Sequence, residues 1–317
     1  MIPCRLQARS SQACEGNVDL TFSNPNQIIQ FKVMNIRTLV FKLMVERLPL
    51  FFNAFRRFQN WSWFYRTPKQ NPHGFLFAGR PDMETGVFES NEVTDVLKIL
   101  ESVSVVVNVG ANCGYYSCLA RKRGKQVIAI EPLALNFRIL LRNLLLNGWE
   151  DVEAYPVGIS DQPGIVKLFG ASTQASLLPG WSRDNSNRYT VIPVTTLDLL
   201  LGDRLNHKRA LFIVDIEGAE YRLLLGAAKQ LSIKPKPIWM VEIDVSMFQP
   251  QAAGGNVTSV PVNPNLLQTF NLFWEQGYTC KMVGEKGLAE AVPVTRSQVV
   301  DWSQGRNQPD HYNFIFE

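Results

Sequence analysis

The sequence predicts an α/β protein built on a mostly parallel, doubly wound β-sheet with helices on both faces. Runs of aliphatic residues recur at 105–109, 127–130, 211–214 and 238–241, and this composition is typical of strands buried on both faces. Segments with helical periodicity stand between these runs. Strands that alternate with helices favour a parallel sheet joined by crossover connections.

The remaining elements are predicted from the periodicity of apolar residues along the chain. We expect helices at residues 91–101, from 115 onward, and at 135–147, 195–201, 219–231 and 266–275. We expect strands at residues 105–109, 127–131, 153–159, 165–169, 189–194, 211–214, 238–241, 278–283 and 312–316.

The stretch from Val105 to Tyr116 combines a buried strand, a glycine turn and the start of a helix. Backbone amides in such a turn and at a helix N-terminus can hold a ligand closely. Gly110 and Gly114 are four residues apart, which does not match the G-x-G-x-x-G fingerprint of nicotinamide dehydrogenases. Glu131 ends the next strand, where a carboxylate can accept the hydroxyls of a nucleoside ribose.

Polar residues stand at the C-terminal ends of several expected strands. They are Asn108 with Gly110, Glu131, Asp215 with Glu217, and Glu242. A single acid there is commonly a solvated group that complements the dipole of the following helix. Four such ends in one sheet favour a ligand site instead, because ligands of open α/β sheets bind beyond the strand tips. For Asp215 and Glu217 this leaves acceptor binding, general-base action or metal binding open, and we assign no metal ligands.

Composition and charge indicate a soluble protein with a basic N-terminal part. The chain has 317 residues, 46% hydrophobic and 19% charged, which is ordinary for a globular protein. Residues 1–80 carry eleven Lys and Arg against three Asp and Glu, whereas the rest is mildly acidic. Five cysteines without C-x-x-C spacing fit a reducing compartment, and neither a signal peptide nor a membrane span is visible. We therefore predict a cytoplasmic protein.

Three regions are expected along the chain. Residues 1–25 are predicted to be disordered, and residues 26–84 to form a basic amphipathic helical extension and linker. Residues 85–317 form the main domain, with loops 170–188 and 246–264 as candidate acceptor lids. The extension either docks on its own domain or makes peripheral membrane contact through residues 27–65, since aromatic residues follow its basic helix.

Five motifs, in order, resemble those of the FkbM-type methyltransferases over about residues 85 to 245. They are Val109-Gly110-Ala111-Asn112-Cys113-Gly114-Tyr115-Tyr116, Glu131-Pro132, Asn143-Leu144-Leu145-Leu146-Asn147, Thr195-Thr196-Leu197-Asp198, and Val214-Asp215-Ile216-Glu217-Gly218-Ala219-Glu220. The resemblance implies the Rossmann-like methyltransferase fold and S-adenosyl-L-methionine as cofactor. It also implies methylation of a hydroxyl oxygen on a small-molecule, sugar or lipid-linked glycan acceptor.

The resemblance also implies roles for individual residues. The residues implied to bind the cofactor are Asn108, Gly110, Ala111, Asn112, Gly114 and Tyr115 around its methionine part, Glu131 and Pro132 at the ribose, and the turn from Gly158 to Asp161 beside the adenine. Asp215 is the first candidate for the general base and Glu217 the second, while Glu89 and Glu242 are assigned to the acceptor.

Two positions depart from the family pattern. The family usually has Asp where this chain has Asn108, and asparagine keeps hydrogen bonding but loses the charge that attracts the cofactor's ammonium group. The family often has Lys at the position of Ile213. The Asn/Asp-Pro-Pro-aromatic signature of amino-directed methyltransferases is absent after Val214, which favours an oxygen acceptor.

One alternative belongs to another class of protein. A catalytically inactive domain that serves as a membrane-surface or partner-binding module would use the basic extension and would explain Asn108. Nucleic-acid binding is not expected, because the main domain is mildly acidic and no additional RNA-binding module is visible.

Overall fold

A computed structural model describes residues 65–170, 175–179, 181, 189–246, 262–284, 287–309 and 312–317. All of them belong to one compact unit, Arg56–Glu317. The expected disorder of residues 1–25 and most of the basic amphipathic extension expected at residues 26–84 lie outside the described residues. Most of the two loops expected as lids lies outside them as well.

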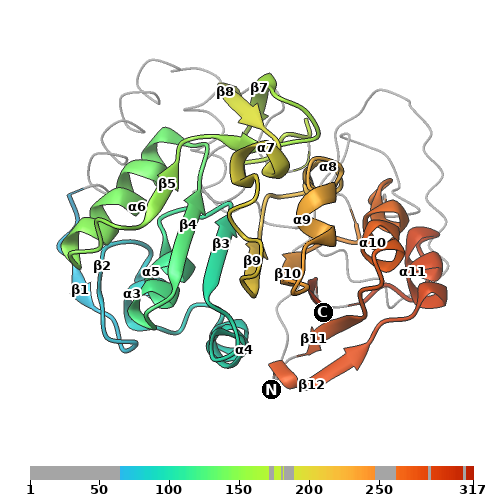
Figure 1. Ribbon diagram of the computed structural model, residues 1–317, viewed down its shortest axis with the longest axis horizontal. Coiled ribbons are helices and arrows are strands. Elements are labelled where there is room, and N and C mark those ends of the chain that lie inside the picture. Colours follow the sequence, from blue (N-terminus) through green and yellow to red (C-terminus); the bar gives the residue numbers. More distant parts are fainter. Residues whose placement is uncertain are drawn as a thin grey trace, which may run out of the picture. The chain divides into compact units, whose positions relative to one another are not determined.

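An eight-stranded sheet forms the centre of this unit (Figure 1). Its order is β12-β11-β13-β10-β9-β3-β4-β5, and the five strands from β10 to β5 pair in parallel. The three strands at the other edge pair antiparallel. The strands span Val105–Val109 (β3), Gln126–Ile130 (β4), Glu153–Tyr155 (β5), Ala210–Val214 (β9), Ile238–Glu242 (β10), Cys280–Gly284 (β11), Gly287–Pro293 (β12) and Asn313–Phe316 (β13).

Helices cover both faces of the sheet, because successive residues of each buried strand point to opposite sides. Val106 of β3 packs with residues of α4, α5 and α6, whereas Val105 and Val107 pack with residues of α7 to α11. The helices on the first face are Ser90–Leu100 (α4), Tyr115–Lys122 (α5) and Ala134–Leu146 (α6). Those on the second face are Leu197–Leu201 (α7), Glu220–Leu225 (α8), Ala228–Ser232 (α9), Leu266–Glu275 (α10) and Arg296–Ser303 (α11).

The strand order reverses at β3, which places a ligand site at its C-terminal end. From β3 the chain builds outward through β4 to β5, and it then returns to the other side of β3 to form β9 and β10. Open α/β sheets bind ligands at such a topological switch point. The predicted fold class, a mostly parallel sheet with helices on both faces, is confirmed.

A small three-stranded sheet follows β5 and replaces part of a longer predicted strand. The strand expected at 153–159 is instead two short strands, β5 and Gly158–Ile159 (β6), which belong to different sheets. Pro156 lies between them, and proline cannot donate to a β-ladder. The strand β6 pairs with Tyr189–Thr195 (β8), which forms a hairpin with Gly164–Phe169 (β7).

Two other sequence predictions need correction. The helix expected at 219–231 is divided into α8 and α9 at Gly226, where an added β-carbon would meet the carbonyl oxygen of Ser160 at 2.3 Å. The sequence analysis also missed β12 and α11. Helix α11 begins with a capping box, in which Thr295 and Gln298 satisfy each other's backbone amides.

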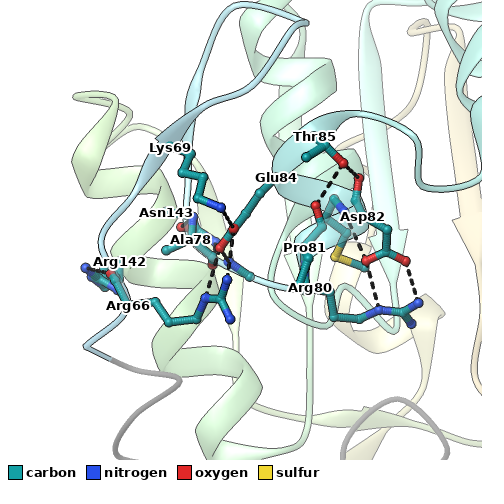
Figure 2. Close-up of polar contacts among 12 residues, drawn as sticks. Arg66, Lys69, Ala78, Arg80, Pro81, Asp82, Glu84, Thr85, Arg142 and Asn143 are labelled. Carbon is teal, nitrogen blue, oxygen red and sulfur yellow. Dashed lines mark hydrogen bonds and ion pairs between the residues drawn. The ribbon is translucent and has the colours of Figure 1, made fainter.

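The segment before α4 is held together by an ion-pair cluster around the buried carboxylate of Glu84, shown in Figure 2. It contains a short hairpin, Lys69–Gln70 (β1) with Leu76–Phe77 (β2), and the helix Pro81–Thr85 (α3). Arg66 makes two hydrogen bonds of 3.0 Å to the Glu84 carboxylate, and Lys69 lies 2.9 Å from the same group. Glu84 is only 1% exposed, so each of its oxygens needs such a partner.

Two asparagines, one on α6 and one at its C-cap, bind the backbone of β2 and of the residue after it as a neighbouring strand would. The Asn143 side chain accepts from the amide of Ala78 at 2.9 Å and donates to its carbonyl at 3.1 Å. Asn147 makes the same pair of bonds to Leu76, at 2.8 Å each. Asn143 also donates to the carbonyl of Cys113 at 2.9 Å, so α6 positions the glycine turn after β3.

Among the described helices, none is both long and apolar enough to cross a membrane.

Candidate functional site

The acids predicted at the strand tips lie side by side in the sheet. Val109 is paired with Ile130 and with Val214, and Val214 with Val241. The residues that follow are therefore aligned in one row, in the order Glu131, Gly110, Asp215 and Glu242. This row lies at the switch point between β3 and β9.

Gly110 lets two strand tips approach each other more closely than any side chain would allow. Its φ is +79°, and an added β-carbon would lie 1.8 Å from the carbonyl oxygen of Asp215. The amide of Asp215 donates to the carbonyl of Val109 at 3.1 Å, which continues the ladder beyond the strands. Glycine is thus required at this position by sterics and by backbone conformation.

Glu131 is buried and connects the glycine turn with the start of α6. Its carboxylate accepts from the amide of Asn112 at 2.8 Å and from that of Leu133 at 2.9 Å. Asn136 lies at 3.4 Å from the same carboxylate. Burial raises the pKa of Glu131 to about 7, although these bonds oppose the rise.

One pocket opens beside Glu131, the residue that the sequence analysis assigns to the cofactor's ribose, and for that expectation we call it the cofactor pocket. Gly110, Asn112, Glu131 and Pro132 line one side of it, and Asp215 and Glu217 line another. Its empty volume, including the solvent at its open mouth, is about 600 Å³. Its apolar wall is formed by Ile130, Leu133, Val157, Ile159, Leu168, Leu177 and Ile192.

A second pocket lies on the other side of the glycine turn, and we call it the acidic pocket. Glu89, Asp215 and Glu242 line it, together with Asn108 and Tyr116. The Tyr116 hydroxyl donates to Glu89 at 2.6 Å. The two pockets share Gly110, Asn112 and Asp215, so these residues form the junction between them.

The carboxylates around Asp215 raise one another's pKa values. Burial and the charges of Glu217 and Glu89 raise the pKa of Asp215 well above its ordinary value. Asp215 still contacts water, because it lines an open pocket. Burial, with Asp215 and Asp244 nearby, raises the pKa of Glu242 to about 9, and burial with Asp244 raises that of Glu217 to about 7. Such carboxylates are stronger bases than free ones.

Three residues of the site have left-handed backbone conformations that favour glycine. They are Glu89 with φ of +42°, Asn112 with φ of +51° and Glu217 with φ of +54°. A non-glycine residue in this region stores strain, and such strain is concentrated at functional sites. The geometry therefore singles out these three positions independently of their charges.

The described part of loop 170–188 packs onto the turn that follows β9. Trp181 is only 3% exposed and lies on Gly218, where an added β-carbon would approach its ring to 2.5 Å. The Ser176 hydroxyl donates to the carbonyl of Glu217 at 2.5 Å, and the Trp181 side chain donates to the Glu217 carboxylate. Ala175 and Leu177 of this loop line the cofactor pocket.

The structure brings most of the predicted site residues together and separates a few. Asp161 does not line either pocket; it accepts from Ser160 at 2.8 Å, and Gly158 and Ile159 of the same turn line the cofactor pocket instead. Tyr115 lines the acidic pocket but is 2% exposed, packed among Phe75, Phe77 and Phe88. Gly114 caps the N-terminus of α5, and Ala111 lines the acidic pocket.

Asn108 is turned toward helix α5. Its side-chain amide donates to the hydroxyl of Ser117 at 3.0 Å, and both residues are buried. Among the described residues, no group of three or more His, Cys, Asp and Glu side chains is arranged to hold a metal ion.

Sequence reasoning missed four residues of this site. Asp244 follows β10 two residues after Glu242, and the alternation of strand side chains could have revealed it. Asn136, Tyr116 and Trp181 contact Glu131, Glu89 and Glu217 only through tertiary structure. No sequence spacing signals the contact of Trp181, which comes from a separate loop.

The fold and the site define an α/β protein with a pocket beside a glycine turn and carboxylates along the adjoining strand tips. The methyltransferase FkbM domain matches residues 108–280, more than half of the chain. The chain therefore belongs to the FkbM methyltransferase family, as the five motifs predicted.

Known structures of methyltransferases are similar to this chain at low sequence identity. One is an O-methyltransferase from Bacillus cereus in complex with SAH, with a TM-score of 0.35, 14% identity, and coverage of 72% of this chain and 79% of that one. Another is magnesium protoporphyrin IX methyltransferase from Synechocystis PCC 6803 with bound SAM, with a TM-score of 0.35, 8% identity, and coverage of 90% and 97%. A search of curated proteins returns no match to this chain. The family match carries the assignment.

With the family established, S-adenosyl-L-methionine is the cofactor, as the sequence predicted. The residues present fit it. The cofactor pocket combines an apolar wall for a purine with a buried carboxylate, Glu131, that can accept from ribose hydroxyls. Gly110 keeps the junction free of a side chain, and Ala111 and Asn112 of the glycine turn line the acidic pocket beyond it.

Proposed function

We propose that this protein transfers a methyl group to a hydroxyl oxygen of a small-molecule, sugar or lipid-linked glycan acceptor. The observation that carries the proposal is the position of Asp215. It is the one acid shared by the cofactor pocket and the acidic pocket, it contacts water, and its pKa is raised by burial and by neighbouring carboxylates.

Bound S-adenosyl-L-methionine supplies an electrophilic methyl group. An alcohol that attacks it must lose its proton, which requires a general base. We assign this role to Asp215, whose carboxylate would take the proton of the acceptor's hydroxyl group. Glu217 is the second candidate, although its carboxylate already accepts from Trp181.

The roles of the other residues follow from the pocket that each one lines. Glu131 and Pro132 hold the ribose side of the cofactor, and Gly110 to Asn112 surround the part that crosses the junction. Glu89 and Glu242 lie across the acidic pocket from the glycine turn, where they can accept hydrogen bonds from an acceptor's hydroxyl groups. Alignment of oxygen, methyl and sulfur supplies much of the rate.

The role assignment is tested by separating binding from turnover. Calorimetry with S-adenosyl-L-methionine should show that Glu131→Ala abolishes binding, with Glu131→Gln as the variant that keeps the shape of the site. Asp215→Asn should still bind S-adenosyl-L-methionine, with an affinity that is reduced but not abolished, and should lose turnover on a panel of hydroxylated acceptors, measured as S-adenosylhomocysteine release. The exposed acid Asp151 provides a control, because Asp151→Asn should change neither quantity. Loss of binding in the Asp215 variant together with retained binding in the Glu131 variant would refute the role assignment. Absence of cofactor binding by the wild type would refute the proposed methyltransferase activity.

Peripheral membrane contact through residues 27–65 stays a prediction from sequence, because all but the last residue of that segment lie outside the described residues. The same holds for a cytoplasmic location.

A further inference from the structure

We infer that the carboxylates around the pocket junction recognise the positive charge on the cofactor's sulfur, so that the protein binds S-adenosylmethionine more tightly than S-adenosylhomocysteine. This inference rests on the proposed function, because it assigns a role to the same site. It concerns affinity for the two forms of the cofactor rather than the acceptor.

Carboxylates surround the junction without a compensating cation among the residues that line it. Asp215 forms the junction, with Glu217 on the side of the cofactor pocket and Glu89 and Glu242 on the side of the acidic pocket. Neither pocket has Lys, Arg or His among its described lining residues. The cation nearest in effect is Arg80, which acts on Glu89 but is paired with Asp82 through hydrogen bonds of 3.2 and 2.5 Å.

The arrangement is costly for the protein until a cation binds. The raised pKa values of Asp215, Glu217 and Glu242 arise from burial and from mutual repulsion, with Asp244 contributing from just beyond β10. Tyr116 donates to Glu89, which relieves that carboxylate alone. A cluster of like charges is stabilised most by a ligand of opposite charge, because the ligand adds attraction where the carboxylates repel one another.

The sulfur of the cofactor is the group expected at this junction. Glu131 would hold the ribose in one pocket, and the methionine part would extend past Gly110 and Asn112 along the glycine turn that lines the other. The sulfur joins these two parts, so it would lie at the junction that Asp215 lines. S-adenosylmethionine carries a sulfonium cation there, whereas S-adenosylhomocysteine carries a neutral thioether. The ammonium group is present in both compounds and cannot distinguish them.

This arrangement has a consequence for turnover. Methyl transfer would remove the sulfonium charge, and Asp215 would take up the acceptor's proton, so the attraction at the junction would be lost together with one negative charge. Once Asp215 returned its proton to solvent, the carboxylates would face a neutral sulfur, which would favour release of S-adenosylhomocysteine.

The test compares the dissociation constants of three ligands by calorimetry, using the full chain. They are S-adenosylmethionine, S-adenosylhomocysteine, and sinefungin, in which an amine replaces the methylated sulfonium. We expect S-adenosylmethionine to bind at least tenfold tighter than S-adenosylhomocysteine. Sinefungin should also bind more tightly than S-adenosylhomocysteine. Glu242→Gln and Glu89→Gln should each reduce this ratio at least threefold. Glu101→Gln, an exposed acid at the end of α4, should leave the ratio unchanged.

The outcomes separate this inference from the proposed function. Equal or tighter binding of S-adenosylhomocysteine by the wild type, or an unchanged ratio in both glutamine variants, would overturn the inference while leaving a methyltransferase. Binding of none of the three ligands would overturn the proposed function as well. S-adenosylhomocysteine is the internal control for folding, because a variant that loses only charge recognition keeps its affinity for this compound.

Discussion

Replacement of Asn143 by alanine should destabilise the domain far more than the same change one helical turn later, at Asn147. Asn143 is fully buried and bonds to both backbone groups of Ala78 and to the carbonyl of Cys113. Each buried polar group left without a partner costs about 1–3 kcal/mol. Loss of three partners therefore predicts a cost of about 3 kcal/mol or more.

The matched variant Asn147→Ala removes a comparable pair of bonds to Leu76, but at a site that water reaches. Water then replaces the amide, and the expected cost is about 1 kcal/mol. For a domain of this size, the difference of about 2 kcal/mol corresponds to about 4–8 °C in melting temperature. Asn143→Asp should resemble the alanine variant, because a carboxylate would face two carbonyl oxygens.

Thermal unfolding followed by circular dichroism measures these costs, and calorimetry with S-adenosylmethionine measures their effect on the site. Because Cys113 belongs to the glycine turn, Asn143→Ala should also weaken cofactor binding, whereas Asn147→Ala should not. Equal losses of melting temperature in the two alanine variants would refute the argument that burial sets the cost.

Three other predictions follow from the same geometry. Gly110→Ala should abolish cofactor binding in calorimetry, because its β-carbon would meet the Asp215 carbonyl at 1.8 Å; retained affinity would contradict the close approach. Lys69 and Arg66 hold the pKa of Glu84 below its usual range, although burial opposes them. The ion pair therefore stabilises the fold at pH values above about 4.3, the ordinary pKa of glutamate, and this stabilisation is lost as the pH falls further. Glu84→Gln should flatten the acidic part of a plot of melting temperature against pH. Turnover should rise with pH through the raised pKa of the carboxylate cluster, because a general base acts deprotonated; a rate that falls over that range would exclude Asp215 and Glu217 as the base.

Much of the sheet was predictable because its strands are buried on both faces. Such strands read as continuous aliphatic runs, and their polar ends could be located from sequence alone. The register between strands could not, yet this register turns four separate residues into one row. The split at Pro156 was predictable in principle, since proline cannot continue a ladder.

The contacts that complete the site were beyond sequence reasoning, because they join segments far apart in the chain. Trp181 reaches Glu217 from the β7–β8 loop, and Asn143 reaches Ala78 across 65 residues. Asp161 is a different case, because the sequence located the correct turn but not the residue of that turn that lines the pocket. The neighbouring Ser160 donates to the Asp161 carboxylate, and Gly158 lines the cofactor pocket instead.

The reversal of strand order at β3 divides the site between two separate lengths of sequence. The cofactor side comes chiefly from residues 108–159, and the carboxylates opposite it come from residues 215–244. The hairpin of β7 and β8 lies between these two lengths in the chain. The second length can therefore diverge to suit a new acceptor while the first keeps its geometry. Asp215 is the exception, since it lines both pockets, and a substitution there affects the cofactor side and the acceptor side together.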